Sequence, residues 1–327
     1  MAAEDQRHTP QPDEAVEAAG RRRRQTRWRR FKWTVRLTVL AILIGYPLLV
    51  GFDGWFYYPN NTIYQLPQTY GLEHEAVRFS TSDSLTLNGW FLPAARPARG
   101  TIIHFHGNAA NISGHLLLVE WLPHRGYNVL MFDYRGYGES EGKVTRAGTI
   151  LDGHAAVDYA LSRADVRGQP LFVYGQSLGG AVAAVVAAER PEIDAVVLES
   201  PFSGYRRIAA RVVRQLVFSQ WVANGLAALT VSAGYDPVNV IAEIAPRPLL
   251  VIVAGADEVC FPELGRELYE AAAEPKEFWS APGAGHLNIR EDHDQELMER
   301  ITDFLERSPT RATVGTLESR PANERQP

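Results

Sequence analysis

The chain has 327 residues, a formal net charge of -5 and one cysteine. This length can form a single domain with a sizeable core, and one cysteine excludes an intrachain disulfide. The acidic balance, which is stronger once the N-terminal region is set aside, argues against a domain that binds nucleic acid.

The positive charge is concentrated near the N-terminus, where residues 18–52 include nine basic residues and no acidic one. The mostly apolar run 37–50 is flanked by tryptophan and tyrosine, which are enriched at membrane interfaces. We therefore predict a basic, disordered cytoplasmic tail over residues 1–32 and a transmembrane signal anchor over residues 33–52. A cleaved signal peptide and an interfacial segment are the alternatives.

Basic residues that precede such an anchor stay in the cytoplasm. The chain is thus predicted to be a single-pass membrane protein whose folded domain lies outside the cytoplasm. Residues 53–71 are expected to form a linker and residues 72–307 the folded domain. The polar segment 308–327 has no sustained apolar period and is predicted to be a disordered tail.

Eight apolar or alternating segments of the domain are predicted to be strands, the first two as an opening hairpin. They are 75–81, 85–92, 101–105, 127–132, 171–174, 195–198, 249–253 and 276–280. Helical patterns separate most of the later strands, which predicts an α/β fold with a mostly parallel, doubly wound sheet.

His106, Gly107 and Asn108 directly follow the strand 101–105. A His-Gly pair after a buried strand is typical of a loop that binds an oxyanion through a backbone N–H, and Asn108 is the predicted donor. The alternative is a metal site, since His104 and His106 share one face of the strand. No third ligand follows at a suitable spacing, so we predict neither a metal nor a cofactor.

A nucleophile elbow is predicted at Ser177, where an apolar strand breaks into Gly-x-Ser-x-Gly before a run of Ala and Val. Gly175 and Gly179 are small enough for strand and helix to approach closely. The N–H of Leu178, directly after the serine, is the predicted second oxyanion donor. The alternative is a strand-to-helix turn capped by an ordinary serine.

The stretch 203–235 is too long for a bare crossover and predicts a small helical cap. Arg207, Arg211 and Arg214 recur within it at helical spacing. They form either a solvated helix face or a surface for anionic lipid headgroups.

A nucleophilic serine at such an elbow is followed in the chain by an acid and then by a histidine base. Only His286 and His293 follow Ser177. His286 lies in a turn-rich loop and is the predicted base, whereas His293 begins a helical pattern.

Asp257 follows the apolar strand 249–253 and is the predicted acid, with Glu258 and Glu199 as alternatives. Cys260 is close enough in sequence to be a site of covalent interference.

Together these motifs resemble the α/β-hydrolase-domain serine hydrolases over about residues 72–307. The matching segments are His-Gly-Asn at 106–108, Asp-Tyr-Arg-Gly-Tyr-Gly-Glu-Ser at 133–140, Gly-Gln-Ser-Leu-Gly-Gly at 175–180, Gly-Ala-Asp at 255–257 and Gly-His at 285–286. The chain is most similar to a membrane-anchored branch that includes bacterial proteins and eukaryotic depalmitoylating and lysophospholipid-cleaving enzymes.

The resemblance implies an α/β-hydrolase fold, a triad of Ser177, Asp257 and His286, and a structural loop at 133–136 beside the site. Cys260 departs from the pattern, where a smaller apolar residue is expected. The predicted activity is cleavage of an acyl ester, a thioester or a lipid-like substrate through an acyl-enzyme on Ser177. A peptidase or amidase of the same fold and a non-catalytic membrane-tethered scaffold are the alternatives.

Overall fold

The computed structural model describes residues 32–34, 54, 56–95, 97–217 and 219–309. The chain divides into two compact units, Met1–Gly51 and Phe52–Pro327. Of the first unit only a short helical piece at 32–34 is described, so most of the expected anchor and nearly all of both expected tails lie outside the described residues. In the described part of the chain, no helix combines the length and the apolar character needed to cross a bilayer.

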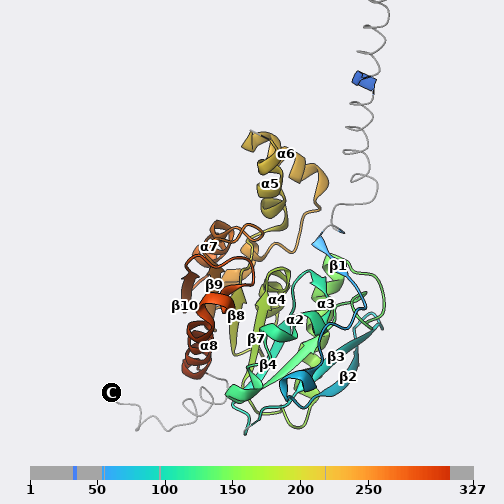
Figure 1. Cartoon of the computed structure of the whole chain (residues 1–327), viewed down its shortest axis with the longest axis vertical. Helices are drawn as coiled ribbons and strands as arrows, with labels where there is room; N and C mark the ends of the chain where they lie inside the picture. The colour runs from blue at the N-terminus through green and yellow to red at the C-terminus, as the bar shows by residue number, and fades with distance from the viewer. Residues whose placement is uncertain (1–31, 35–53, 55, 96, 218, 310–327) are drawn as a thin grey trace, which may run out of the picture. The chain divides into compact units, whose positions relative to one another are not determined.

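The second unit is built on one sheet of eight strands in the order β10-β9-β8-β7-β4-β6-β3-β2 (Figure 1). Only the pairs β2/β3 and β3/β6 are antiparallel, and all others are parallel. The strands are β2 (Glu75–Ser80), β3 (Thr86–Leu92), β4 (Gly100–Phe105), β6 (Tyr127–Phe132), β7 (Leu171–Gln176), β8 (Ala195–Glu199), β9 (Leu249–Ala254) and β10 (Lys276–Ala281). The predicted strands and the mostly parallel α/β sheet are confirmed.

Helices cover both faces of this sheet. On β4, Ile103 and Phe105 pack into one apolar cluster with α3 (Arg146–Ser162), α4 (Leu178–Glu189) and α7 (Pro262–Ala271). Ile102 packs into the other cluster with α2 (Ile112–His115) and α8 (Ile289–Arg307). Because both faces are covered, the central strands are buried at every position and read as unbroken apolar runs.

The strand order determines where in the sheet the candidate site lies. From β4 the chain crosses to β6 on one side and later to β7 on the other, so the winding direction reverses between β4 and β7. Loops at the carboxyl ends of strands diverge at such a switch point and leave room for a ligand. The loop after β4 and the turn after β7 are therefore neighbours.

Two helices, α5 (Tyr205–Leu216) and α6 (Gln220–Thr230), form the excursion between β8 and β9 that was predicted as a cap. They stand away from the sheet in Figure 1. Arg207 and Arg211 of α5 form ion pairs with Glu267 and Glu263 of α7, the latter at 2.8 Å. Two of the three arginines of the predicted stripe are thus turned toward the body of the domain.

Part of the expected linker 53–71 has regular structure. Tyr58–Pro59 forms the short strand β1, which pairs in parallel with β5 (Ala109–Ala110). Tyr57 is buried in the core, and Phe56 packs edge-on against Tyr205 with ring centroids 5.2 Å apart. The rings of Phe56 and Tyr57 thus pack into the folded unit, ahead of the expected boundary at 72.

Candidate active site

Ser177 lies at the turn between β7 and α4. Its φ of 55° and ψ of -120° fall outside the regions that non-glycine residues usually adopt. The Ser177 N–H donates a 2.9 Å hydrogen bond to the carbonyl oxygen of Glu199 on β8, which helps to hold the turn. A backbone strained in this way presents the serine hydroxyl at the carboxyl end of β7, next to a helix N-terminus.

The glycines on either side of the serine permit this geometry. A Cβ on Gly179 would lie 2.0 Å from the carbonyl oxygen of Phe105, and a Cβ on Gly175 would lie 2.7 Å from the Cβ of Ala183. No side chain fits at either position. The start of α4 therefore packs against the end of β4, which places the loop after β4 beside Ser177.

The three predicted triad residues form one chain of hydrogen bonds. His286 Nε2 is 3.0 Å from Ser177 Oγ, and His286 Nδ1 is 2.8 Å from Asp257 Oδ2. Because a carboxylate only accepts, Nδ1 carries the proton and Nε2 is free to accept one from the serine. The buried Asp257 carboxylate is held by its Oδ1, which accepts the N–H groups of Val259 at 2.8 Å and Cys260 at 2.7 Å.

Two backbone hydrogen bonds bring the acid and the histidine together. Asp257 follows β9 and His286 follows β10, and these strands are parallel neighbours. The N–H of Gly255 donates to the carbonyl of Ala281 at 2.7 Å, and that of Ala256 donates to Ala284 at 2.9 Å. The two loops are therefore joined immediately before each functional side chain.

The alternative base and acid lie elsewhere. The Nε2 of His293, within α8, is 2.9 Å from the carbonyl oxygen of Pro282. The Glu258 side chain is exposed. The polar contacts of the Ser177 hydroxyl are with His286 and Cys260 instead.

The loop after β4 lies against the serine. A Cβ on Gly107 would be 3.7 Å from the Cβ of Ser177. Within the part of the chain that the structure describes, the backbone N–H groups of Asn108 and Leu178 donate to no other protein group. Both donors predicted for an oxyanion are thus uncommitted, and their role there stays a prediction.

Comparison with known proteins identifies the family of this chain. Residues 96–244 match the protein family described as serine aminopeptidase, S33. The chain is 38% identical to the uncharacterized protein YfhR of Escherichia coli over 258 residues, covering 77% of this chain and 86% of YfhR. It is 34% identical to the alpha/beta hydrolase domain-containing protein WAV2 of Arabidopsis thaliana, covering 63% of this chain and 69% of WAV2. The chain belongs to the α/β-hydrolase family.

Solved structures show the same fold. The hydrolase superimposes on the esterase Pf2001 of Pyrococcus furiosus with a TM-score of 0.65 and 26% sequence identity, covering 77% of this chain and 98% of that one. The predicted α/β-hydrolase fold is confirmed.

The two histidines weighed as metal ligands have other partners in the hydrolase. His104 Nε2 is 2.7 Å from Gln176 Oε1, and His106 Nδ1 is 2.8 Å from the carbonyl oxygen of Gly107. Burial lowers the pKa of His104 to about 3 and that of His106 well below its usual value. Among the described residues, no group of three His, Cys, Asp or Glu side chains is placed to hold a metal ion.

Glu199, the alternative acid, belongs to a buried network beneath the elbow. Its Oε2 accepts hydrogen bonds from the Tyr174 hydroxyl and, at 2.7 Å, from Gln176 Nε2. Burial raises the pKa of this carboxyl group. Because Gln176 directly precedes Ser177, the network supports the turn at Ser177, and Asp257 is the carboxylate that bonds His286.

Cys260 makes a contact that the sequence did not predict. Its Sγ lies 3.6 Å from Ser177 Oγ. The thiol is buried, and burial raises its pKa to about 12, so it stays protonated and is a poor nucleophile. The residue that departs from the family pattern therefore forms part of the wall around the serine.

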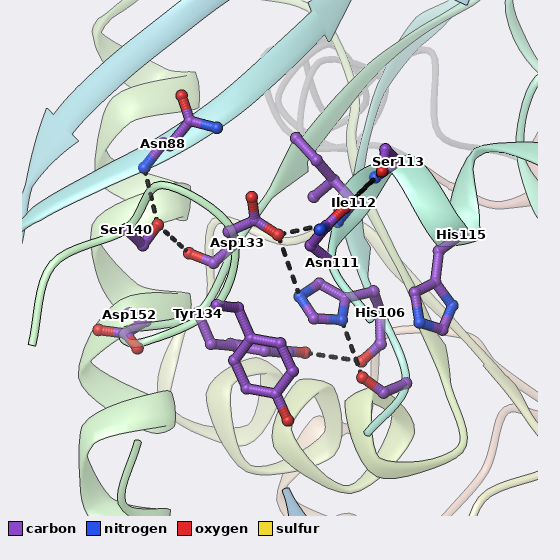
Figure 2. Close-up of polar contacts among 12 residues, drawn as sticks. Asn88, His106, Asn111, Ile112, Ser113, His115, Asp133, Tyr134, Ser140 and Asp152 are labelled. Atoms are coloured by element: carbon purple, nitrogen blue, oxygen red, sulfur yellow. Dashed lines mark hydrogen bonds and ion pairs between the residues drawn. The ribbon is translucent and has the colours of Figure 1, made fainter. Parts of the chain in front are cut away.

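Three carboxylates hold the segment 133–136 in the domain: its own Asp133, and the two that pair with Arg135. Asp133 Oδ1 accepts the N–H of Ile112 at 2.8 Å and lies 3.9 Å from His106 Nε2, as Figure 2 shows. The Arg135 guanidinium pairs with Asp152 and with Asp83, each at 2.8 Å. Burial raises the pKa of Asp133 to about 7.

Proposed function

We propose that this hydrolase cleaves a carboxylic ester or thioester through an acyl-enzyme on Ser177. The observation that carries the proposal is the chain of hydrogen bonds from Asp257 through His286 to Ser177 at a strained strand-to-helix turn. The likeness to a Pyrococcus furiosus esterase supports an ester as the substrate.

In the proposed mechanism His286 Nε2 takes the serine proton as Oγ attacks the acyl carbon, and later gives it to the leaving alcohol or thiol. Asp257 fixes the histidine tautomer and stabilises the imidazolium that forms. The N–H groups of Asn108 and Leu178 bind the carbonyl oxygen as it becomes negative. In the second half of the reaction His286 takes a proton from water as the water attacks the acyl-enzyme. It then returns the proton to Ser177 Oγ, which leaves as the acid product forms.

Labelling with a fluorophosphonate tests the nucleophile. We expect the wild-type chain to be labelled and to hydrolyse a p-nitrophenyl ester, and we expect Ser177→Ala to lose both properties while melting at nearly the same temperature. The triad acts as a unit, so adding His286→Ala should lower the residual rate little further. Esterase activity retained in purified Ser177→Ala would contradict the assignment.

A serine peptidase or amidase is the second candidate, because the matching family is described as a serine aminopeptidase. The same triad serves both reactions, which differ in the contacts of the substrate pocket. A panel of esters, thioesters and aminoacyl amides of graded acyl length separates them. Higher kcat/KM on esters or thioesters supports the first candidate, and higher kcat/KM on amides supports the second.

We also propose that residues 33–52 anchor the enzyme in a membrane, with residues 1–32 in the cytoplasm and the hydrolase domain outside it. The support is the sequence alone: a basic flank, an apolar run and adjoining aromatic residues. An anchored domain would meet acyl or lipid-like substrates at the lipid surface.

A further inference from the structure

The loop formed by His106, Gly107 and Asn108 has every carbonyl oxygen hydrogen-bonded by a side chain. The Tyr134 hydroxyl donates to the His106 carbonyl at 3.2 Å, and the Tyr137 hydroxyl donates to the Asn108 carbonyl at 2.7 Å. His106 Nδ1 donates to the Gly107 carbonyl at 2.8 Å, since a carbonyl oxygen can only accept. We call His106, Tyr134 and Tyr137 the loop clamp.

The clamp determines where the Asn108 N–H points. The Gly107 carbonyl and the Asn108 N–H belong to one planar peptide unit and point in opposite directions. The His106 imidazole that holds this carbonyl is fully buried, so the N–H on the other side of the plane points away from the core. Gly107 lies against Ser177, so the outward face of this peptide is beside the nucleophile.

The two tyrosines fix the neighbouring peptide planes. Tyr134 holds the plane before the donor peptide and Tyr137 holds the plane after it, so the backbone has little freedom to rotate on either side. Both hydroxyls come from the segment after β6, and both rings are fully buried. Figure 2 shows the Tyr134 ring packed beside His106, with centroids 4.4 Å apart.

We infer that His106, Tyr134 and Tyr137 are positioning residues that aim the Asn108 N–H at the oxyanion formed on Ser177. The inference rests on the proposed function and goes beyond it, because it assigns a role to the Tyr-Arg-Gly-Tyr segment, which the sequence analysis treated as structural. A pre-aimed donor stabilises the transition state without reorganising during the reaction. The clamp should therefore affect kcat more than KM.

The test compares Tyr137→Phe and Tyr134→Phe with a matched control, Tyr159→Phe on α3. Each change deletes one hydroxyl, and the control hydroxyl accepts a 3.0 Å hydrogen bond from Arg163, away from the loop. The probes are a p-nitrophenyl ester and an aryl trifluoromethyl ketone. Serine attack on the ketone forms a C–O bond, moves the carbonyl electrons onto oxygen and passes the serine proton to His286, which leaves a hemiketal oxyanion in the site.

We expect Tyr137→Phe to lower kcat by about tenfold, less than the 10²–10³ loss from deleting an oxyanion donor outright. KM should stay within about twofold, and the inhibition constant of the ketone should rise by the same factor as kcat falls. Tyr134→Phe should show the same pattern with a smaller loss, because its hydrogen bond is longer. Tyr159→Phe should leave kcat, KM and ketone affinity unchanged.

A loss of kcat without a matching loss of ketone affinity, or a loss shared by Tyr159→Phe, would overturn the inference. So would both loop variants staying within about twofold of wild type in kcat. If Tyr137→Phe does not fold, Tyr134→Phe alone decides by the same criteria. A wild-type enzyme that neither cleaves the ester nor binds the ketone would contradict the proposed function itself, whereas an active wild type with unaffected variants contradicts only the clamp.

Discussion

Asp257 and Glu199 are both buried carboxylates at the carboxyl ends of neighbouring strands, yet they have different partners. Asp257 bonds His286, while Glu199 bonds Tyr174 and Gln176. A Ser-His-acid site needs a carboxylate that fixes the histidine tautomer, and hydrogen bonding rather than residue type or burial identifies it.

Asp257→Asn should lower kcat on the order of 10⁴-fold, because an amide at this position favours the wrong tautomer of His286. Glu199→Gln should retain kcat within about tenfold, since an amide oxygen can still accept from Tyr174 and Gln176. The measurement is ester hydrolysis by both variants, with melting temperatures as a check on folding. The opposite ranking would move the acid to Glu199.

Asp133 should give the stability of the protein a distinctive pH dependence. Burial raises its pKa from 3.8 to about 7, with the Glu139 carboxylate as a further raising influence and the neutral His106 facing it. The folded state therefore holds a proton that the unfolded state has released. The free energy of unfolding should therefore fall by an amount on the order of 4 kcal/mol as the pH rises from about 4 to about 7.

Asp133→Asn should remove this fall in the free energy of unfolding with pH. The amide stays neutral, and its oxygen can still accept the hydrogen bond from the Ile112 N–H. Denaturant unfolding at a series of pH values from about 4 to 8 measures the effect. Asp83→Asn is the control: pairing with Arg135 lowers the pKa of Asp83 to about 2, so its contribution is lost only below that window. Equal slopes in wild type and Asp133→Asn would contradict the assigned protonation state.

The sequence predicted the three residues that the structure joins by hydrogen bonds, because chain order and strand ends restrict the choice to few candidates. It did not predict the contact between Cys260 and Ser177 or the hydroxyls that clamp the loop. Tyr137 and Asn108 are 29 residues apart, and their contact depends on β4 and β6 being neighbours in the sheet. No local pattern carries that information.

At the scale of elements, the longer strands were predictable because burial on both faces requires apolar residues at consecutive positions. The two-residue strands β1 and β5 were not, since two residues carry no period and Tyr57 and Tyr58 resembled a membrane-interface belt. The cap was predicted from its length. The pairing of Arg207 and Arg211 with α7 became visible only in three dimensions, and it weakens a role for those charges at lipid headgroups.

The close approach of α4 to β4 can be tested with glycine substitutions. Gly179→Ala should destabilise the fold by at least about 3 kcal/mol and abolish activity, because its Cβ would overlap backbone atoms that cannot move aside. Gly225→Ala, at an exposed α6 position with nothing within 4 Å, should instead stabilise the protein by up to about 1 kcal/mol. Chemical denaturation measures both, and a near-neutral Gly179→Ala would contradict the packing.

At the scale of the whole molecule, the charge asymmetry of the chain predicts its orientation in a membrane. Alkaline phosphatase fused after Arg307 should be active, because it works only outside the cytoplasm. Green fluorescent protein at the same point should be dark if the domain is exported by the general secretory route. An inactive alkaline phosphatase fusion together with a fluorescent green fluorescent protein fusion would place the hydrolase domain in the cytoplasm.

The pairing of β1 with β5 connects the segment around Tyr58 to the loop after β4. The Tyr58 N–H donates a 2.8 Å hydrogen bond to the Asn108 carbonyl, the same oxygen that Tyr137 holds. An enzyme shortened to begin near Leu72 loses that donor together with β1. We therefore expect slower turnover of this enzyme because the loop after β4 is held less firmly, and the slower turnover would not by itself show that membrane contact matters.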